Sequence, residues 1–217
     1  MILIPAKNLA NAKQRLASVL NQAARTELAK AMLHDVLEVV AKVEKPADVS
    51  LVTCDPFAIA LAGEFQFRVI ADQLNRSESD AIEAATAWCV ARGVRNTLVI
   101  PADIPQIQAS ELQEIFRSAP AAGSVLVPAA DGRGTNAVFR CPAALFPLRF
   151  GNDSFKAHLT AAQSVQKPCI VLQLPGIALD IDTPADLQQL AALPGETHAQ
   201  QFFRQWRNAE APLAVNE

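Results

Sequence analysis

The sequence predicts an α/β fold in which a mixed, mostly parallel sheet is flanked by helices. Short apolar runs alternate with helix-period stretches through the first half, which favours parallel strands joined by right-handed crossovers. The second half has more strand-like runs per residue, which indicates antiparallel additions. Because no repeat, linker or low-complexity stretch divides the 217 residues, one domain is expected over 1–195, with a tail over 196–217.

Strands and helices are expected to alternate in the first half. The strands are read from short apolar runs at 2–5, 49–53, 67–71 and 97–101. The helices are expected over about 11–43, 57–62 and 79–92. The first helix is the longest, and its apolar residues recur at three- and four-residue steps. These residues are Leu28, Met32, Leu33, Val36, Leu37 and Val40.

In the second half, further strands are expected at 124–128, 137–140, 168–172 and 177–181. Ser110 is expected to cap a helix that reaches about residue 117, and Thr183 one that ends near residue 193. The tail is expected to add a helix. Its aromatic residues would pack either against the body or against a second subunit, which would make the protein a homodimer. They are Phe202, Phe203 and Trp206.

The composition argues against several classes of protein. Lys and Arg number 19 against 22 Asp and Glu, so the chain lacks the excess of basic residues that nucleic-acid or membrane surfaces need. The four cysteines and three histidines are far apart, which predicts neither a zinc motif nor a disulfide framework. The sequence shows no run of about 18 apolar residues and no signal-peptide pattern, so a cytoplasmic protein is expected.

Three aspartates form the strongest chemical signal. Asp103 follows the buried strand expected at 97–101, and ligands bind beyond the carboxyl ends of such strands. Asp180 and Asp182 stand two apart at the end of the strand expected at 177–181, so their side chains would point to one face. Neighbouring carboxylates repel each other unless a cation lies between them. Since oxygen ligands without His or Cys suit Mg²⁺, we expect one or two Mg²⁺ ions here.

Two kinds of segment could bind an anion. Lys7, Lys13 and Arg15 lie at the top of the first strand and the start of the first long helix, where free N–H groups would favour a phosphate chain, although a solvated charged face would look similar. The glycine-rich stretch 131–136 is either a hairpin turn or a loop whose N–H groups approach an anion. The stretch 150–158 resembles a helix entrance.

With these segments in order, the chain resembles the 2-phospho-L-lactate guanylyltransferase family of coenzyme F-420 biosynthesis, over nearly 1–190. The resemblance is carried by six segments together: Pro5-Ala6-Lys7, Ala12-Lys13-Gln14-Arg15-Leu16, Pro101-Ala102-Asp103-Ile104-Pro105, Gly134-Thr135-Asn136, Phe150-Gly151 with Ser154-Phe155 and His158, and Asp180-Ile181-Asp182-Thr183-Pro184.

The resemblance implies a Rossmann-like GT-A nucleotidyltransferase fold and transfer of GMP from GTP to a small phosphorylated three-carbon acid. It implies that Asp103, Asp180 and Asp182 bind Mg²⁺. Thr135, Gly151 and Ser154 would bind the acid. Lys13 and Arg15 would face the triphosphate as catalytic cations, with Lys7 and Asn75 also binding the nucleotide.

The chain departs from the family pattern in two places. The family usually has Gly-Leu-Asn where this chain has Gln73-Leu74-Asn75, and Asp153 adds an acid to the loop expected to hold the anionic acceptor. Two alternatives stay open at this point. One is a nucleotidyltransferase that acts on a sugar phosphate or a molybdopterin cofactor, and the other is a nucleotide-binding domain without catalysis.

Overall fold

The computed structural model describes residues 1–72 and 77–210. Within them, seven strands form one sheet in the order β3-β2-β1-β4-β6-β5-β7. Neighbouring strands run parallel, except that β6 is antiparallel to both β4 and β5. The expected mixed, mostly parallel sheet is therefore confirmed. The strands are β1 (Ile2–Pro5), β2 (Val49–Val52), β3 (Arg68–Ile70), β4 (Thr97–Val99), β5 (Gly123–Pro128), β6 (Thr135–Cys141) and β7 (Cys169–Val171).

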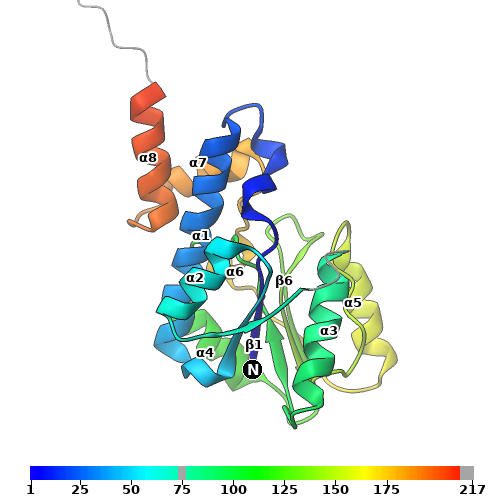
Figure 1. Cartoon of the computed structure of the whole chain (residues 1–217). Coiled ribbons are helices and arrows are strands. Elements are labelled where there is room, and N and C mark those ends of the chain that lie inside the picture. Colours follow the sequence, from blue (N-terminus) through cyan, green and yellow to red (C-terminus); the bar gives the residue numbers. More distant parts are fainter. Residues whose placement is uncertain (73–76, 211–217) are drawn as a thin grey trace, which may run out of the picture.

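Helices cover both faces of the sheet (Figure 1). The core that includes α1, α2 and α4 lies on one face, and the core that includes α3 and α5 lies on the other. The helices are α1 (Gln22–Val43), α2 (Pro56–Glu64), α3 (Glu78–Val90), α4 (Ala109–Ser118), α5 (Ser154–Ser164), α6 (Pro175–Ala178), α7 (Pro184–Ala192) and α8 (His198–Glu210). Three single turns of 3-10 helix are η1 (Leu9–Asn11), η2 (Gln14–Leu16) and η3 (Pro46–Asp48).

The strands are apolar on both faces because both faces are buried. Along β1, Ile2 and Ile4 pack into the core under α1, whereas Leu3 packs into the core under α3. The same alternation occurs on β5, where Val125 and Leu126 lie on opposite faces. This burial explains why the strands appear in the sequence as continuous apolar runs.

The expected helix over 11–43 is wrong at its beginning. The α-helix begins only at Gln22, because the Asn21 side chain accepts a hydrogen bond from the Ala24 N–H and caps it. The preceding residues form η1 and η2, and Lys13 stands between these two turns with a left-handed backbone at φ 57°. Lys13 therefore reaches the sheet edge from an irregular loop.

The strand expected at 177–181 is also wrong. Pro175 begins the short helix α6, and the chain then continues without a strand partner among the described residues. Its apolar residues, Ile177 and Ile181, are fully buried all the same. Backbone bonds tie the segment to its surroundings, from the Ile181 N–H to the Asp103 carbonyl at 3.1 Å and from the Ala130 N–H to the Ala178 carbonyl at 2.8 Å. The apolar run at 177–181 therefore reflects burial of a short helix and the loop after it, and does not indicate a strand.

The helix caps were predicted with mixed success. Thr183 caps α7 as expected, with its hydroxyl oxygen accepting from the Asp186 N–H. Ser110, however, lies inside α4, whose cap position is Gln108. The Gln108 N–H donates to the Glu111 carboxylate at 2.9 Å.

The tail helix α8 lies against α1 (Figure 1). Both oxygens of the buried Asp35 on α1 accept backbone N–H bonds from the first turn of α8, from His198 at 2.7 Å and Ala199 at 3.0 Å. Phe203 is buried in the main core, and Phe202 and Trp206 pack against it. No helix in the part of the chain that the structure describes is long and apolar enough to cross a membrane.

Candidate active site

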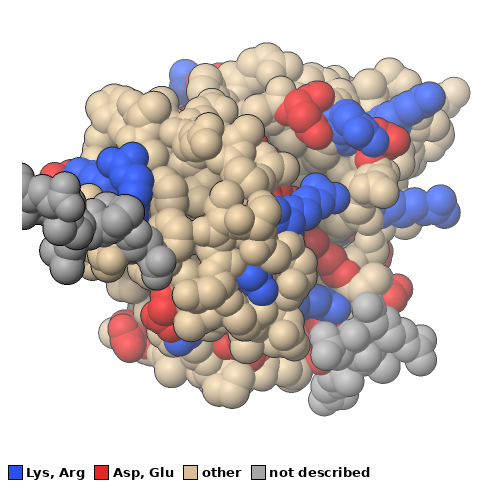
Figure 2. Space-filling model, turned by 90° about the horizontal axis from the view of Figure 1, so that it is seen from above, with Lys and Arg blue, Asp and Glu red and all other residues tan. Residues whose placement is uncertain are grey.

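Most of the expected site residues lie at one edge of the sheet. The parallel strands β1 and β4 end there, and the antiparallel strand β6 begins there. Figure 2 looks down on this edge and shows basic and acidic side chains next to one another at a hollow in the surface. Residues far apart in the sequence meet at this edge: Lys13 and Asp182, 169 positions apart, form a hydrogen bond there.

Two adjoining cavities lie at this edge. The first, of about 220 Å³, is lined by Lys7, Lys13 and apolar residues from η1 and α1. The second, of about 310 Å³, is polar and is lined by Arg15, Thr135, Gly151 and Ser154, among others. The residues common to both linings are Glu78, Pro101, Asp103 and Asp182. Carboxylates thus lie where the two cavities meet.

Lys13 joins two of these carboxylates. Its ammonium lies 2.5 Å from Asp103 Oδ2 and 2.8 Å from Asp182 Oδ1, and its side chain is only 7% exposed. Arg15 lies farther out, with its guanidinium 3.8 Å from Asp182 Oδ2 and its side chain 68% exposed. The two cations expected to act in catalysis are therefore both next to Asp182.

Lys13 and its two carboxylate partners stabilise one another's charged forms. Burial alone would lower the pKa of Lys13, but the charges and hydrogen bonds of Asp103 and Asp182 outweigh burial and raise it. Burial would likewise raise the pKa of Asp182, but Lys13, with a smaller contribution from Arg15, holds it below its ordinary value. Lys13 is therefore charged across the physiological range, and so is Asp182.

Asp180 lies on the same cavity but has a different partner. Its Oδ1 accepts a hydrogen bond from the Asn136 side chain at 3.0 Å. The Asn136 amide also donates to the carbonyls of Ile177 and Ala178, so Asn136 fixes the whole segment before Asp180. Burial raises the pKa of Asp180, and Asp103 adds to the rise. A nearby cation would stabilise its charged form.

Glu78 is a further acid at this edge that the sequence did not single out. It begins α3 and lines both cavities. Burial, with the nearby charge of Asp103, raises the pKa of Glu78 to about 7. Glu78 therefore exchanges a proton near neutral pH, and a phosphate bound beside it would favour the protonated form.

The three aspartates fit a hard divalent cation. Asp103, Asp180 and Asp182 all line the second cavity, and none of the residues lining it is a His or a Cys. Asp103 Oδ1 is buried and accepts no hydrogen bond from the residues that the structure describes. Such an oxygen is costly to bury unless it has a partner. Carboxylate oxygens of this kind are the ligands that Mg²⁺ prefers.

On the other side of the second cavity, three side chains from β6 and α5 form a buried hydrogen-bond chain. His158 Nε2 accepts the Arg149 N–H at 2.9 Å. In the neutral ring Nδ1 then carries the proton and donates to Thr135 Oγ1 at 3.0 Å. Ser154 Oγ donates to the same oxygen at 3.3 Å. Because Thr135 Oγ1 accepts both bonds, its own hydrogen can donate to a group in the cavity.

This arrangement predicts a pH-dependent stability. Burial, with the positive charge of Arg140, lowers the pKa of His158 from 6.5 to about 4. Between these pH values the unfolded chain therefore binds more protons than the folded chain. The stability of the folded state that depends on neutral His158 is complete above pH 6.5 and is lost as the pH falls to 4. We expect His158→Gln to reduce the fall in unfolding free energy over that range by about 3 kcal/mol. Urea denaturation of both proteins at the two pH values measures this. An equal fall in both would contradict the assignment.

The glycine-rich stretch forms the turn between β5 and β6. Asp131 Oδ1 accepts the N–H groups of Arg133 at 2.7 Å and Gly134 at 3.1 Å, so the turn satisfies its own donors. The alternative in which these N–H groups approach an anion is therefore wrong. The acid in the acceptor loop has a partner too, since Asp153 accepts from the Arg133 guanidinium at 2.7 Å. Asp153 thus contributes little net negative charge to the cavity.

The remaining expected residues have varied positions. Gly151 has φ 122°, which favours glycine, and its carbonyl accepts the Ser154 N–H at the start of α5. Lys7 lines the first cavity and pairs with Asp72 at 2.9 Å, at the end of β3. Asn75 lies outside the described residues.

The chain shares its fold with solved nucleotidyltransferase structures. It superposes on a nucleotidyl transferase from Methanothermobacter with a TM-score of 0.61 and 15% identity, over 94% of this chain and 97% of that one. It also superposes on 4-diphosphocytidyl-2C-methyl-D-erythritol synthase with a TM-score of 0.59 and 17% identity, over 87% and 95%. At such identities the likeness concerns the fold.

The family follows from the sequence. The family model described as "Guanylyl transferase CofC like" matches residues 1–212, so the chain belongs to this family and is a nucleotidyltransferase. It is 37% identical to phosphoenolpyruvate guanylyltransferase of Rhodococcus erythropolis, over 88% of this chain and 89% of that protein. It is 34% identical to 3-phospho-D-glycerate guanylyltransferase of Colwellia psychrerythraea (88% and 91%). It is 29% identical to 2-phospho-L-lactate guanylyltransferase of Methanothermobacter thermautotrophicus (97% and 92%).

Proposed function

We propose that this protein is a Mg²⁺-dependent guanylyltransferase that transfers GMP from GTP to a phosphorylated three-carbon acid and releases pyrophosphate, as a step of coenzyme F-420 biosynthesis. The observation that carries the proposal is the meeting of two cavities at Asp103 and Asp182, in a member of a guanylyltransferase family. Two substrates bound in adjoining cavities would face each other across these carboxylates. The arrangement suits transfer from one to the other.

The first cavity suits the nucleotide. Its apolar lining, from residues such as Leu9 and Met32, offers contact for a sugar and base, and Lys7 and Lys13 offer positive charge for phosphates. Arg15 extends from the same loop into the second cavity, where it would meet the phosphate chain next to the acceptor. Asn75 would bind the nucleotide, as the family resemblance implies.

The second cavity suits a small acid. The Thr135 hydroxyl offers a hydrogen-bond donor beside the N-terminus of α5, which begins at Ser154, and the helix dipole stabilises an anion there. Gly151 lets the loop turn into that helix. His158 acts as a positioning residue, since its bond orients the Thr135 hydroxyl.

The chemistry needs positioning and charge neutralisation more than proton transfer. A phosphate oxygen of the acid attacks the α-phosphorus of GTP, and the bond from that phosphorus to the bridging oxygen breaks, so that pyrophosphate leaves. The attacking phosphate has a second pKa near ~6 and is already ionised at neutral pH. Mg²⁺ held by Asp103, Asp180 and Asp182 supplies charge neutralisation when bound. Lys13 and Arg15 add fixed positive charge to the same place.

An acceptor panel tests the proposal. Pyrophosphate release is measured with GTP or ATP, together with phosphoenolpyruvate, 2-phospho-L-lactate, 3-phospho-D-glycerate or a sugar phosphate, each with and without Mg²⁺. We expect release with GTP, with Mg²⁺ and with at least one of these acids. Release with a sugar phosphate and none of the acids would favour the alternative acceptor class. Release without Mg²⁺ would contradict the role of the aspartates.

Replacing Thr135 with Val tests the acceptor cavity. The substitution keeps the shape and removes a donor to a charged ligand, so we expect the KM of the acid to rise about tenfold or more while the KM of GTP stays within about twofold. Thr160→Val, on the exposed side of α5, is the matched control and should leave both constants unchanged. An unchanged KM for the acid in Thr135→Val would place the acceptor elsewhere.

A further inference from the structure

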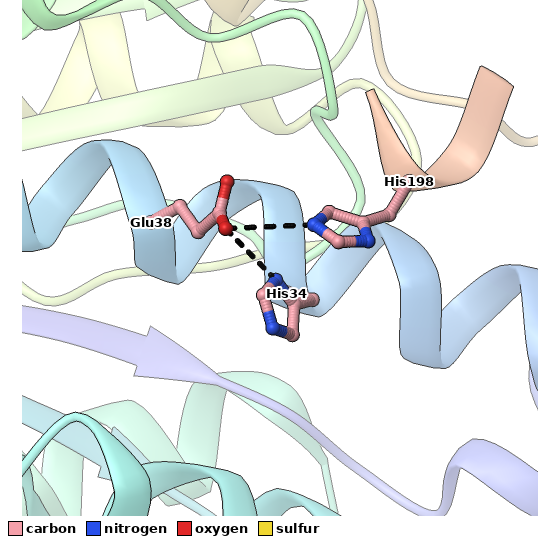
Figure 3. Close-up of side chains that lie close together, drawn as sticks. All are labelled: His34, Glu38 and His198. Carbon is pink, nitrogen blue, oxygen red and sulfur yellow. Dashed lines mark hydrogen bonds and ion pairs between the residues drawn. The ribbon is translucent and has the colours of Figure 1, made fainter. Parts of the chain in front are cut away.

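A second cluster of ionisable side chains lies away from the active site, between α1 and α8. His34 and Glu38 are one turn apart on α1, and His198 is the first residue of α8. Figure 3 shows the two imidazole rings next to each other, both with a nitrogen directed at the Glu38 carboxylate. Glu38 Oε1 lies 3.6 Å from His34 Nδ1 and 3.5 Å from His198 Nε2.

These distances suit a tetrahedral metal. One ligand atom from each residue lies within 4.8 Å of the other two. Metal–ligand bonds of about 2.0–2.1 Å, as zinc makes to His nitrogen and carboxylate oxygen, place neighbouring tetrahedral ligands about 3.3 Å apart. Both distances from a histidine nitrogen to Glu38 Oε1 are within a few tenths of an ångström of this value. The two histidine nitrogens lie within 4.8 Å of each other, and rotation of their side chains would bring them to this separation.

The fold fixes this geometry independently of any metal. The spacing of four residues places His34 and Glu38 on the same side of α1. His198 is held by its backbone, because its N–H donates to Asp35, the residue next to His34. The His34 ring is also packed edge-on against Phe65, with ring centroids 5.6 Å apart. A site formed by fixed backbone loses less entropy when it binds an ion.

The cluster has an unsatisfied ligand atom and access to solvent. His34 Nδ1 is buried and makes no hydrogen bond with the residues that the structure describes, since 3.6 Å to Glu38 is too long. Both histidines line a cavity of about 340 Å³ that is open to solvent. Lys30 lines the same cavity, but its charge is paired with Glu27 at 2.7 Å. A divalent cation thus has an approach path.

We propose that His34, Glu38 and His198 bind one Zn²⁺ ion, which fastens the C-terminal helix α8 to α1. Two imidazole nitrogens and one carboxylate oxygen suit zinc, with water completing the tetrahedron, whereas Mg²⁺ prefers oxygen ligands alone. The role is structural, because the three residues lie outside both cavities of the active site. The proposed zinc site can therefore be tested independently of the proposed transferase activity.

Binding and stability test the proposal on the full chain. Zn²⁺ is titrated in excess Mg²⁺, which occupies the aspartate site, and Co²⁺ serves as a spectroscopic probe. We expect one equivalent of Zn²⁺ to bind and to raise the Tm by about 5 °C at saturating metal. Co²⁺ should give the visible absorption typical of tetrahedral coordination by nitrogen and oxygen.

Variants separate this site from other binding. His34→Ala and His198→Ala should each abolish the Co²⁺ spectrum and the rise in Tm. Glu27→Gln removes an acid beside the same cavity but outside the cluster, and it should leave both unchanged. If the wild type shows no Zn²⁺-dependent rise in Tm, the proposal is wrong. If the His variants keep the rise, the ion binds elsewhere and the proposal is equally wrong.

Discussion

Replacing Asp103 with Asn is expected to lower kcat by about 10³-fold or more while the protein stays folded. The change keeps the size of the side chain but removes the charge between the two cavities, where Asp103 contacts Lys13 and presents an unpartnered oxygen. A thousandfold loss corresponds to about 4 kcal/mol of transition-state stabilisation. The remaining activity should respond weakly to Mg²⁺, since a charged ligand is lost. Pyrophosphate release across a Mg²⁺ titration measures both effects.

Asp48→Asn is the matched control for this substitution. Asp48 is exposed in η3, just before β2 begins and therefore at the opposite edge of the sheet. The Asp48→Asn variant should retain wild-type kcat and Mg²⁺ dependence. Thermal unfolding of Asp103→Asn should remain a single cooperative transition. Turnover near the wild-type rate would show that Asp103 does not act in the reaction.

Replacing Lys13 with Met is expected to have two effects. Turnover should fall about 10³-fold, because the substitution removes a buried positive charge from the place where two anionic substrates meet. Without metal the protein should also lose about 3 kcal/mol of stability, since Asp103 and Asp182 lose their shared partner. Mg²⁺ should restore much of this stability by taking over that role. The rise in Tm on adding Mg²⁺ should therefore be larger than in the wild type.

Lys42→Met provides the comparison, because Lys42 is an exposed lysine near the end of α1. It should change neither turnover nor the effect of Mg²⁺ on the Tm. An equal rise in Tm for Lys13→Met and the wild type would contradict the prediction. It would mean that the metal does not occupy the place between Asp103 and Asp182.

The sequence predicted the sheet well because buried strands leave a simple signal. Apolar runs located all seven strands of the described residues to within a few residues, and Asp103 was recognised because it follows one of them. Asp180 and Asp182 were recognised for a reason that proved wrong. They lie on a loop, where a backbone bond from Ile181 to Asp103 and the Asn136 side chain position them. Two acids close in sequence can converge in either conformation.

Other features could not be read from local patterns. The position of Lys13 depends on a left-handed residue between two short turns, which helical periodicity cannot indicate. Glu78 shows no special pattern, and its raised pKa comes from burial next to residues distant in sequence. His158 did have a signal, since it stands four residues after Ser154, one helical turn along α5. That spacing predicts neighbouring side chains and could have given a role to His158, which the family resemblance included without one.

Because β6 runs antiparallel to its neighbours, the two proposed substrate cavities are built by different parts of the chain. The proposed nucleotide cavity is built mainly by segments before residue 104, whereas the proposed acceptor cavity is built mainly by the β5–β6 turn and the segment leading into α5. Turns between antiparallel strands tolerate changes of length better than the strands do. The half proposed to bind the acid could therefore be remodelled by exchange of short surface loops, with the half proposed to bind the nucleotide left intact. Such a separation of the two cavities would produce relatives that are named for three different acids.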